Sequence, residues 1–297
     1  MDGLCKSYRR REARALDGFS IEVRPGEILG LIGPNGAGKT TFLGCLLGFL
    51  EPDAGRIEIG GMAPDSLSVR RLVGYLPERL TFDRWMTARA FLRLHHELAE
   101  QPGESREEDV AASLMRVQID SSAWDTGLAR FSRGMLQRLG LAQALIGRPR
   151  ILLLDEPASG VDPAGLLLFR QLFRELHADG VTIVLNSHQL DQIERVCDRV
   201  AFIASGRLGQ IENLSEGADS SRVVVVRWLA DGAPEREQVA ALGQTAGAAL
   251  LEWTPPRAAF SVPDDRSAAA LVRALVEGGI AVAEMAPREG RLERFFT

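Results

Sequence analysis

The chain has 297 residues, of which 45% are hydrophobic and 25% are charged, and its formal net charge is −5. This length and composition predict a globular protein of about two domains, large enough to bury a sizeable core. The acidic balance gives no sign of a nucleic-acid-binding surface, although the arginines at residues 9–11 are available to lipid headgroups or a partner.

Signals for secretion and membrane insertion are missing from the sequence. No uninterrupted apolar run approaches the ~18–20 residues that span a bilayer. The first residues lack a basic segment followed by a hydrophobic one, so we expect no secretory signal. Three widely spaced cysteines without a C-x-x-C pair (Cys5, Cys45 and Cys197) predict reduced thiols that serve as packing residues. These observations favour a cytosolic protein that touches a membrane only through a partner.

Strand-like and helix-like segments alternate between residues 19 and 206, which predicts an α/β domain with a mostly parallel sheet. An apolar run at residues 27–32 predicts a buried strand, and residues 41–47 predict the first turns of a helix. The residues between them satisfy every fixed position of the phosphate loop G-x-x-x-x-G-K-[ST]. Because such a loop is a nest of backbone N–H groups at a helix N-terminus, we predict that it binds nucleotide phosphates and is more than a glycine-rich turn. The predicted binding residues are Gly33, Pro34, Asn35, Gly36, Ala37, Gly38, Lys39, Thr40 and Thr41.

The next part of the chain, about residues 84–148, has a mainly helical pattern. Polar segments at residues 101–105 and 120–122 interrupt it. We predict that these residues form a helical subdomain inserted into the sheet domain.

An apolar run at residues 151–154 predicts a buried strand that ends in Asp155 and Glu156. At the carboxyl end of the strand, Asp155 is placed to hold Mg²⁺ directly or through water, together with the Thr40 hydroxyl. Glu156 is then the natural general base for a water molecule directed at the γ-phosphate, which Lys39 would contact together with the β-phosphate. Two surface acids that cap the next helix are the less favoured alternative for this pair. Beside the phosphate loop, the two carboxylates predict hydrolysis of a bound nucleotide.

A polar segment at residues 215–221 predicts a linker between a domain of residues 1–217 and a second of residues 218–297. The second has the pattern strand, helix, strand, strand, helix, strand, which is the order of a small ferredoxin-like α+β domain. It contains no catalytic group of residues. The predicted elements are residues 223–229, 234–247, 250–253, 259–262, 267–277 and 280–286.

From residue 4 to about residue 217 the chain resembles the ATP-binding cassette (ABC) ATPases, a resemblance that implies a P-loop NTPase core with a helical subdomain. Ser132 and Gly134 match the family's signature L-S-G-G-Q, which in this family binds the γ-phosphate of ATP held by the other subunit. Arg133 and Met135 stand where the family usually has Gly and Gln, as in the branch that serves ABC-2-type exporters. Read in isolation, this segment is a helix N-cap.

The resemblance implies roles for four more residues. Tyr8 stands where the family stacks an aromatic ring on adenine, Asp162 belongs to the D-loop that shapes the facing site of a dimer, and His188 is the switch histidine that contacts the γ-phosphate. Glu78 occupies the Q-loop position where most members have Gln, so its carboxylate is a candidate metal ligand and a weaker candidate for a second base. Few residues precede Tyr8, so we expect the strand before it to be missing or shortened.

The resemblance implies an ATPase subunit that binds ATP and Mg²⁺, forms a homodimer on ATP and powers an ABC-2-type membrane exporter. Its partner would be an integral membrane permease, whose coupling helix would lie in a groove formed by residues 87–98. The subunit would be cytoplasmic, at the inner face of the cell membrane, with no nucleic acid bound. A soluble ABC ATPase acting on the ribosome or nucleic acid would need two cassettes, a long coiled coil or a basic face, and the sequence has none. Intact Lys39, Asp155, Glu156 and His188 argue against a regulator that does not hydrolyse ATP.

Overall fold

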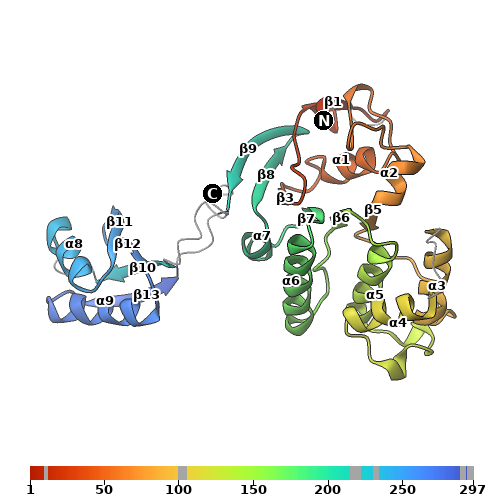
Figure 1. Cartoon of the computed structure of the whole chain (residues 1–297). Coiled ribbons are helices and arrows are strands. Elements are labelled where there is room, and N and C mark those ends of the chain that lie inside the picture. Colours follow the sequence, from red (N-terminus) through yellow and green to blue (C-terminus); the bar gives the residue numbers. More distant parts are fainter. Residues whose placement is uncertain (10–12, 100–105, 215–221, 230–233, 288–291, 293–297) are drawn as a thin grey trace. The chain divides into compact units, whose positions relative to one another are not determined.

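The structure is a computed structural model, which describes the chain except residues 10–12, 100–105, 215–221, 230–233, 288–291 and 293–297 (Figure 1). The chain divides into two units, Met1–Ser215 and Glu216–Thr297. The predicted boundary between residues 217 and 218 lies outside the described residues. No helix in the described part of the chain combines the length and the apolar character that a membrane crossing requires.

A six-stranded sheet in the order β5-β6-β7-β3-β8-β9 forms the centre of the first unit. All its neighbouring strands are parallel except β8 and β9, which confirms the prediction of a mostly parallel sheet. Because β7 lies between β3 and β6, the carboxyl ends of these three strands meet at one edge of the sheet, where ligands bind in open α/β sheets. The strands are β3 (Ile28–Ile32), β5 (Val73–Leu76), β6 (Ile151–Asp155), β7 (Thr182–Asn186), β8 (Arg199–Ala204) and β9 (Arg207–Asn213).

Four helices of this unit follow strands or turns of the sheet domain. The longest, α6, begins with Pro163 at its first turn and with the Asp162 carboxylate accepting a hydrogen bond from the Gly165 N–H at 2.7 Å. Its apolar face packs inward through residues such as Phe169 and Phe173. The four helices are α1 (Lys39–Leu46), α2 (Leu67–Leu72), α6 (Pro163–Ala178) and α7 (Leu190–Val196).

A second, antiparallel sheet of three strands contains the start of the chain, in the order β2-β1-β4. The strands are β1 (Asp2–Lys6), β2 (Leu16–Phe19) and β4 (Ala54–Arg56). The expectation that the first strand is missing is therefore wrong, because β1 is present with five residues. Five residues suffice because β1 pairs on both sides and buries Leu4 completely, and Phe19 of β2 packs on Phe42 of α1 with ring centroids 5.0 Å apart.

In its described residues, the predicted helical segment contains three helices and two short 3₁₀ turns. Thr87 caps α3 by accepting a hydrogen bond from the Ala90 N–H at 3.1 Å. In the same subdomain, the buried indole of Trp124 donates to the Ile119 carbonyl at 2.8 Å. The Arg89 guanidinium lies over the Trp124 ring, 5.0 Å from its centroid. The elements are α3 (Ala88–Leu98), α4 (Arg106–Arg116), η1 (Ser121–Ala123), η2 (Leu128–Arg130) and α5 (Arg133–Leu145).

The second unit has the predicted element order, with an antiparallel sheet in the order β11-β12-β10-β13. Its core contains the stacked rings of Trp228 and Trp253, with centroids 5.1 Å apart, and the fully buried Phe260. The assignment of this unit to the ferredoxin-like folds stays a prediction. Its elements are β10 (Arg222–Trp228), α8 (Arg236–Thr245), β11 (Ala249–Thr254), β12 (Arg257–Val262), α9 (Asp265–Glu277) and β13 (Val282–Pro287).

Candidate functional site

The phosphate loop joins β3 to α1, and its glycines are required by space as well as by backbone angles. A Cβ atom at Gly33 would lie 2.1 Å from the Ile203 carbonyl oxygen, and one at Gly38 would lie 2.3 Å from the Ala15 carbonyl oxygen. Gly38 also has a φ of 115°, which side chains rarely allow. The loop therefore brings its backbone close to the neighbouring segments and leaves its N–H groups at the start of α1.

Lys39 is the first residue of α1 and is almost fully buried. Its ammonium donates hydrogen bonds to the carbonyl oxygens of Gly33 at 2.6 Å and Pro34 at 3.1 Å. Burial lowers the pKa of Lys39, and the opposing attraction comes first from Glu156 and then from Asp155. The positive charge thus lies in the loop where phosphate oxygens would bind.

Asp155 ends β6, and Asn186 lies opposite it at the end of β7. The Asn186 Nδ2 group donates a hydrogen bond to Asp155 Oδ1, while Asn186 Oδ1 is buried without a partner in the part of the chain that the structure describes. Burial raises the pKa of Asp155, the Asn186 hydrogen bond opposes this, and the charges of Glu78 and Glu156 raise it further. Asp155 is therefore a desolvated carboxyl among other acids.

Glu156 follows the end of β6 and adopts a φ of 51°, in the left-handed region that non-glycine residues seldom occupy. Its N–H donates to the Asn186 carbonyl at 2.8 Å. Its carboxylate Oε2 lies 2.8 Å from His188 Nδ1 and accepts a hydrogen bond from the Ser187 hydroxyl at 3.4 Å. The two predicted catalytic residues thus come from adjacent strand ends and contact each other directly.

One cavity of about 770 Å³ connects these groups. It brings together most of the predicted residues: Tyr8, Asn35, Gly36, Ala37, Gly38, Lys39, Thr40, Thr41, Glu78, Glu156 and His188. Ser159 and Asn186 line it too, although sequence reasoning did not select them. Asn186 lies opposite Asp155 only because β6 and β7 are neighbours in the sheet, and local sequence does not reveal that strand order. The predicted residues outside its lining are Gly33, Pro34, Ser132, Gly134, Asp155 and Asp162.

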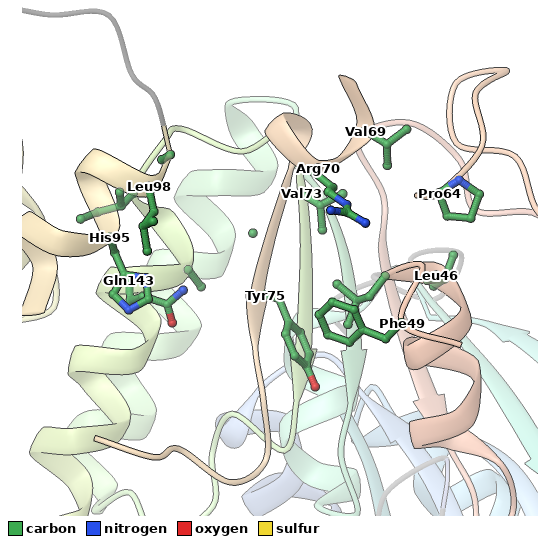
Figure 2. Close-up of a pocket in the computed structure, with 15 residues that line it drawn as sticks. Leu46, Phe49, Pro64, Val69, Arg70, Val73, Tyr75, His95, Leu98 and Gln143 are labelled. Atoms are coloured by element: carbon green, nitrogen blue, oxygen red, sulfur yellow. The ribbon is translucent and has the colours of Figure 1, made fainter. Parts of the chain in front are cut away.

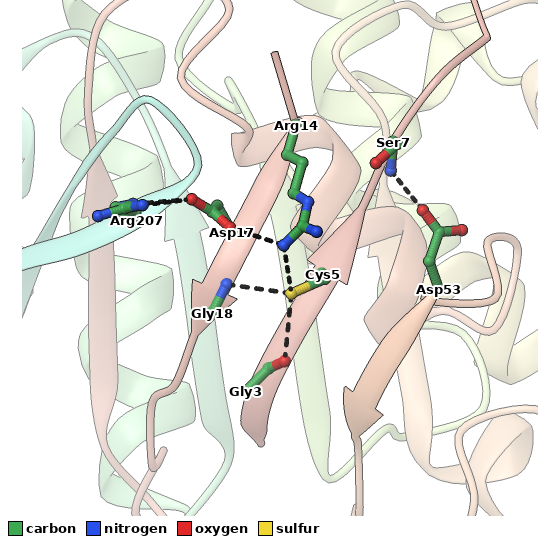
Figure 3. Close-up of polar contacts among 8 residues, drawn as sticks. All are labelled: Gly3, Cys5, Ser7, Arg14, Asp17, Gly18, Asp53 and Arg207. Carbon is green, nitrogen blue, oxygen red and sulfur yellow. Dashed lines mark hydrogen bonds and ion pairs between the residues drawn. The ribbon is translucent and has the colours of Figure 1, made fainter. Parts of the chain in front are cut away.

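Tyr8 approaches this cavity from the segment after β1. Its hydroxyl is 3.3 Å from the Thr41 hydroxyl. The preceding N–H, of Ser7, donates to Asp53 Oδ2 at 2.6 Å (Figure 3), and the Lys6 ammonium lies 3.0 Å from Asp53 Oδ1. The Asp53 carboxylate therefore fixes the backbone immediately before Tyr8.

A second cavity, of about 370 Å³, lies between the sheet domain and the helical subdomain. Figure 2 shows Tyr75 of β5 beside Phe49, with His95 and Leu98 of α3 across from them. Burial lowers the pKa of His95. Burial also raises the pKa of Tyr75 to about 12, and the carboxylates Asp155 and Glu78 contribute to this rise. Most of the side chains that line the cavity are apolar. Tyr75, in one of its walls, is also affected by the charges of two acids of the nucleotide site.

Comparison with known proteins identifies the family. Residues 16–159 match the model of the family described as ABC transporter. The daunorubicin resistance ATP-binding protein DrrA3 of Streptomyces coeruleorubidus is 33% identical over 313 residues, covering 100% of this chain and 93% of the relative. The chain belongs to the ABC transporter ATP-binding proteins.

Two further comparisons agree with this ABC ATPase assignment. The Nod factor export ATP-binding protein I of Paraburkholderia xenovorans (strain LB400) is 38% identical over 224 residues, covering 75% of this chain and 71% of the relative. A solved ATP-binding subunit of an ABC transporter shares 28% identity at a TM-score of 0.66, covering 72% of this chain and 89% of that chain. The chain is an ATPase whose hydrolysis of ATP drives transport, as the resemblance predicts. The roles of individual site residues stay predictions.

Proposed function

We propose that the chain dimerises on ATP and, through an integral membrane permease, powers an ABC-2-type exporter. The observation that supports this most directly is the division of the predicted residues. The pocket gathers residues 35–41 of the phosphate loop, Glu156 and His188, whereas Ser132, Gly134 and Asp162 lie at the starts of α5 and α6, outside its lining. Residues that a chain does not use on its own nucleotide are available for the nucleotide of a second copy.

ATP would bind with its phosphates at the start of α1. The N–H groups of the phosphate loop and the Lys39 ammonium supply the positive potential, because the helix dipole and the charge act in a partly desolvated place. The Tyr8 ring, held next to the pocket by the Ser7–Asp53 hydrogen bond, would stack on the adenine.

The oxygen donors near the phosphate loop fit Mg²⁺. Thr40 and Glu78 line the pocket and Asp155 lies buried beside it. These hydroxyl and carboxylate oxygens are the ligands that Mg²⁺ prefers, and Mg²⁺ commonly takes one or two carboxylates with substrate phosphates completing its shell. Burial raises the pKa of Asp155, and repulsion by Glu78 and Glu156 raises it further; a divalent cation would relieve that repulsion. When bound, Mg²⁺ neutralises charge on the β- and γ-phosphates.

Hydrolysis places a water oxygen on the γ-phosphorus, releases ADP as the bond to the β-phosphate oxygen breaks, and transfers a proton from the water to a base. Glu156 is the proposed base, and its contact with His188 at 2.8 Å orients the carboxylate toward the pocket. His188 would contact the γ-phosphate. Glu78 lines the same pocket and is the weaker candidate for a second base.

The dimer would use the start of α5. Ser132 caps this helix by accepting a hydrogen bond from the Met135 N–H at 3.2 Å, and a helix N-terminus attracts anions. In a homodimer, Ser132 and Gly134 would face the γ-phosphate of the partner's ATP, and Asp162 would shape the facing site. Two nucleotides would then be enclosed between two chains.

The permease would bind at the second cavity (Figure 2), where the predicted groove of residues 87–98 forms one wall through His95 and Leu98. This assignment places the subunit in the cytoplasm at the inner face of the membrane. The names of the relatives, which refer to Nod factor export and daunorubicin resistance, support an exporter and disfavour a ribosomal or nucleic-acid role.

The first experiment measures ATP hydrolysis per chain over a wide range of protein concentration. We expect the rate to rise with concentration, because two chains complete each site. Glu156→Gln should lose at least about 100-fold in kcat while it binds ATP and accumulates as a dimer. Glu175→Gln, an acid-to-amide change on the surface of α6, serves as the matched control. A Glu156→Gln chain that stays monomeric with ATP and hydrolyses it normally would show that the assigned base is wrong.

The permease assignment has its own test. Leu98 is 69% exposed and lines the second cavity, whereas Met115 is 60% exposed and does not. Leu98→Asp should abolish the stimulation of hydrolysis by a co-expressed permease and leave the basal rate unchanged. Met115→Asp should retain the stimulation; equal behaviour of the two variants contradicts the assignment.

A further inference from the structure

Arg133, the first residue of helix α5, contacts the loop that follows β6. Arg133 Nη2 donates a hydrogen bond to the Ser159 hydroxyl at 2.8 Å. Ser159 lines the nucleotide pocket, but Arg133 does not. An arginine in the signature segment is therefore connected within the same chain to the wall of that chain's own pocket.

Gly160 makes room for this arginine. A Cβ atom at Gly160 would lie 2.3 Å from Arg133 Nε and 2.5 Å from its Cδ, so any other residue would force the Arg133 side chain to move. Gly160 also has a φ of 73°. The guanidinium thus lies directly across the backbone of the loop, and its position depends on glycine at residue 160.

The same face of α5 contacts the loop a second time. Gln137 follows Arg133 by four residues, so the two side chains lie on one side of the helix. Gln137 is buried, and its Nε2 lies 3.5 Å from the Glu156 carbonyl oxygen, which also accepts the Ser159 N–H at 3.0 Å. One face of α5 therefore contacts both ends of the loop of residues 156–160.

Glu156 requires such support. Its left-handed backbone conformation persists only where the surroundings hold it. The Asn186 carbonyl fixes the N–H of Glu156 from the β7 side. On the other side, the backbone turns back through Ser159, which Arg133 holds.

We propose that Arg133 is a positioning residue for Glu156: it fixes the loop of residues 156–160 to α5 and thereby aims the carboxylate at the γ-phosphate. The proposal rests on the proposed role of Glu156 as the base. Since Arg133 lies between Ser132 and Gly134, the residue that fixes a chain's own base also adjoins the residues proposed to meet the partner's nucleotide. The arginine that departs from the usual glycine of the signature then acts on its own chain's site.

The test compares Arg133→Gln with Arg138→Gln. Arg138 is a matched control because it lies on the same helix and its guanidinium donates to the Gln118 carbonyl at 2.8 Å, away from the loop. In the nucleotide-free chain we expect Arg133→Gln to speed hydrogen exchange of the Ser159 and Val161 amides by about tenfold. Its kcat should fall by about tenfold, with the Kd for ATP within about twofold of wild type, because a misplaced base impairs reaction more than binding.

Further variants separate the outcomes. Arg133→Gln combined with Ser159→Ala should exchange no faster than Ser159→Ala alone, since both changes remove the same hydrogen bond. Unchanged exchange in Arg133→Gln overturns the proposal, and so does faster exchange with wild-type kcat. Loss of ATP-induced dimers with unchanged exchange would instead assign Arg133 to the partner's nucleotide. Wild-type chain that fails to hydrolyse ATP contradicts the proposed function, while the exchange result still decides whether Arg133 holds the loop.

Discussion

The two units of the chain differ in what their interiors contain. In the described part of the first unit, most of the buried polar or charged residues lie in or beside the nucleotide pocket, namely Lys39, Gln137, Asp155, Asn186 and Ser187. The others lie elsewhere and are paired, Arg199 with Glu27 and His96 with Asp109. In the described part of the second unit, the buried side chains are apolar or aromatic, and Trp228 Nε1 is a buried polar atom without a hydrogen-bond partner. Burying polar groups weakens folding unless they are well paired, so their clustering marks the place where function rather than stability selects the residues.

This difference predicts opposite responses to substitution. Interior changes in the second unit should cost stability and spare ATP chemistry. Changes at the pocket should cost chemistry and spare, or even improve, stability. Four substitutions test this contrast, beginning with the one that has the largest expected effect.

Phe260→Ala should destabilise the second unit by about 4 kcal/mol, because Phe260 is fully buried at the centre of its core. The stacked Trp228 and Trp253 rings allow the transition to be followed by tryptophan fluorescence during urea unfolding. The Kd for ATP should stay at the wild-type value. Leu251→Ala, at a position 51% exposed, is the control and should change stability little. A matching loss of ATP affinity in Phe260→Ala would break the separation between the two units.

Lys39→Ala should weaken ATP binding by about 100-fold, since it removes a charged donor from a desolvated loop. Lys39→Arg should restore little, because a planar guanidinium does not fit the space of a compact ammonium bonded to Gly33 and Pro34. Titration with a fluorescent ATP analogue measures both variants. Stability should change less than binding does; full restoration by Arg would mean that charge alone matters at this position.

Tyr8→Ala should raise the Kd for ATP by about tenfold through the loss of base stacking. Tyr8→Phe keeps the ring and loses only the contact with the Thr41 hydroxyl at 3.3 Å, so its affinity should stay close to that of wild type. Binding of GTP and ATP, compared by calorimetry, reports whether the ring meets the base. Equal losses in the two variants would assign the effect to the hydroxyl.

Residues that act through local sequence could be predicted, and residues that act through strand order could not. The glycines, Lys39 and Thr40 of the phosphate loop stand in one continuous segment, so the sequence alone identifies them. The Glu156–His188 contact requires β6 and β7 to be neighbours, which the resemblance to the family implied and local patterns did not. Asn186 escaped notice for the same reason.

The error at the first strand has a similar cause. Strand β1 was expected to be missing or shortened because few residues precede Tyr8, whereas its pairing with both β2 and β4 involves distant parts of the chain. The element order of the second unit was predictable because each of its strands and helices has its own apolar pattern.

Asp155→Asn is expected to have the smallest effect on stability, but the sign of that effect is the sharpest test of the contrast. Burial raises the pKa of Asp155, and the charges of Glu78 and Glu156 raise it further. A carboxyl whose pKa is higher in the folded chain weakens folding at any pH above that raised pKa, and this penalty disappears below the unfolded value of 3.8. The amide should therefore increase the free energy of unfolding by about 1 kcal/mol near neutral pH, while hydrolysis is lost.

Asp53→Asn provides the control of opposite sign. Hydrogen bonds from Lys6 and from the Ser7 N–H lower the pKa of Asp53, so its carboxylate contributes stability that is present at neutral pH and is lost as pH falls through the lowered pKa. Urea unfolding of the nucleotide-free chain from neutral pH down to about pH 4 should show Asp155→Asn above wild type and Asp53→Asn below it, with the excess of Asp155→Asn shrinking as the pH falls. If Asp155→Asn is instead less stable than wild type at neutral pH, the ionised carboxylate supports the fold, and buried charge no longer distinguishes the pocket from the core of the second unit.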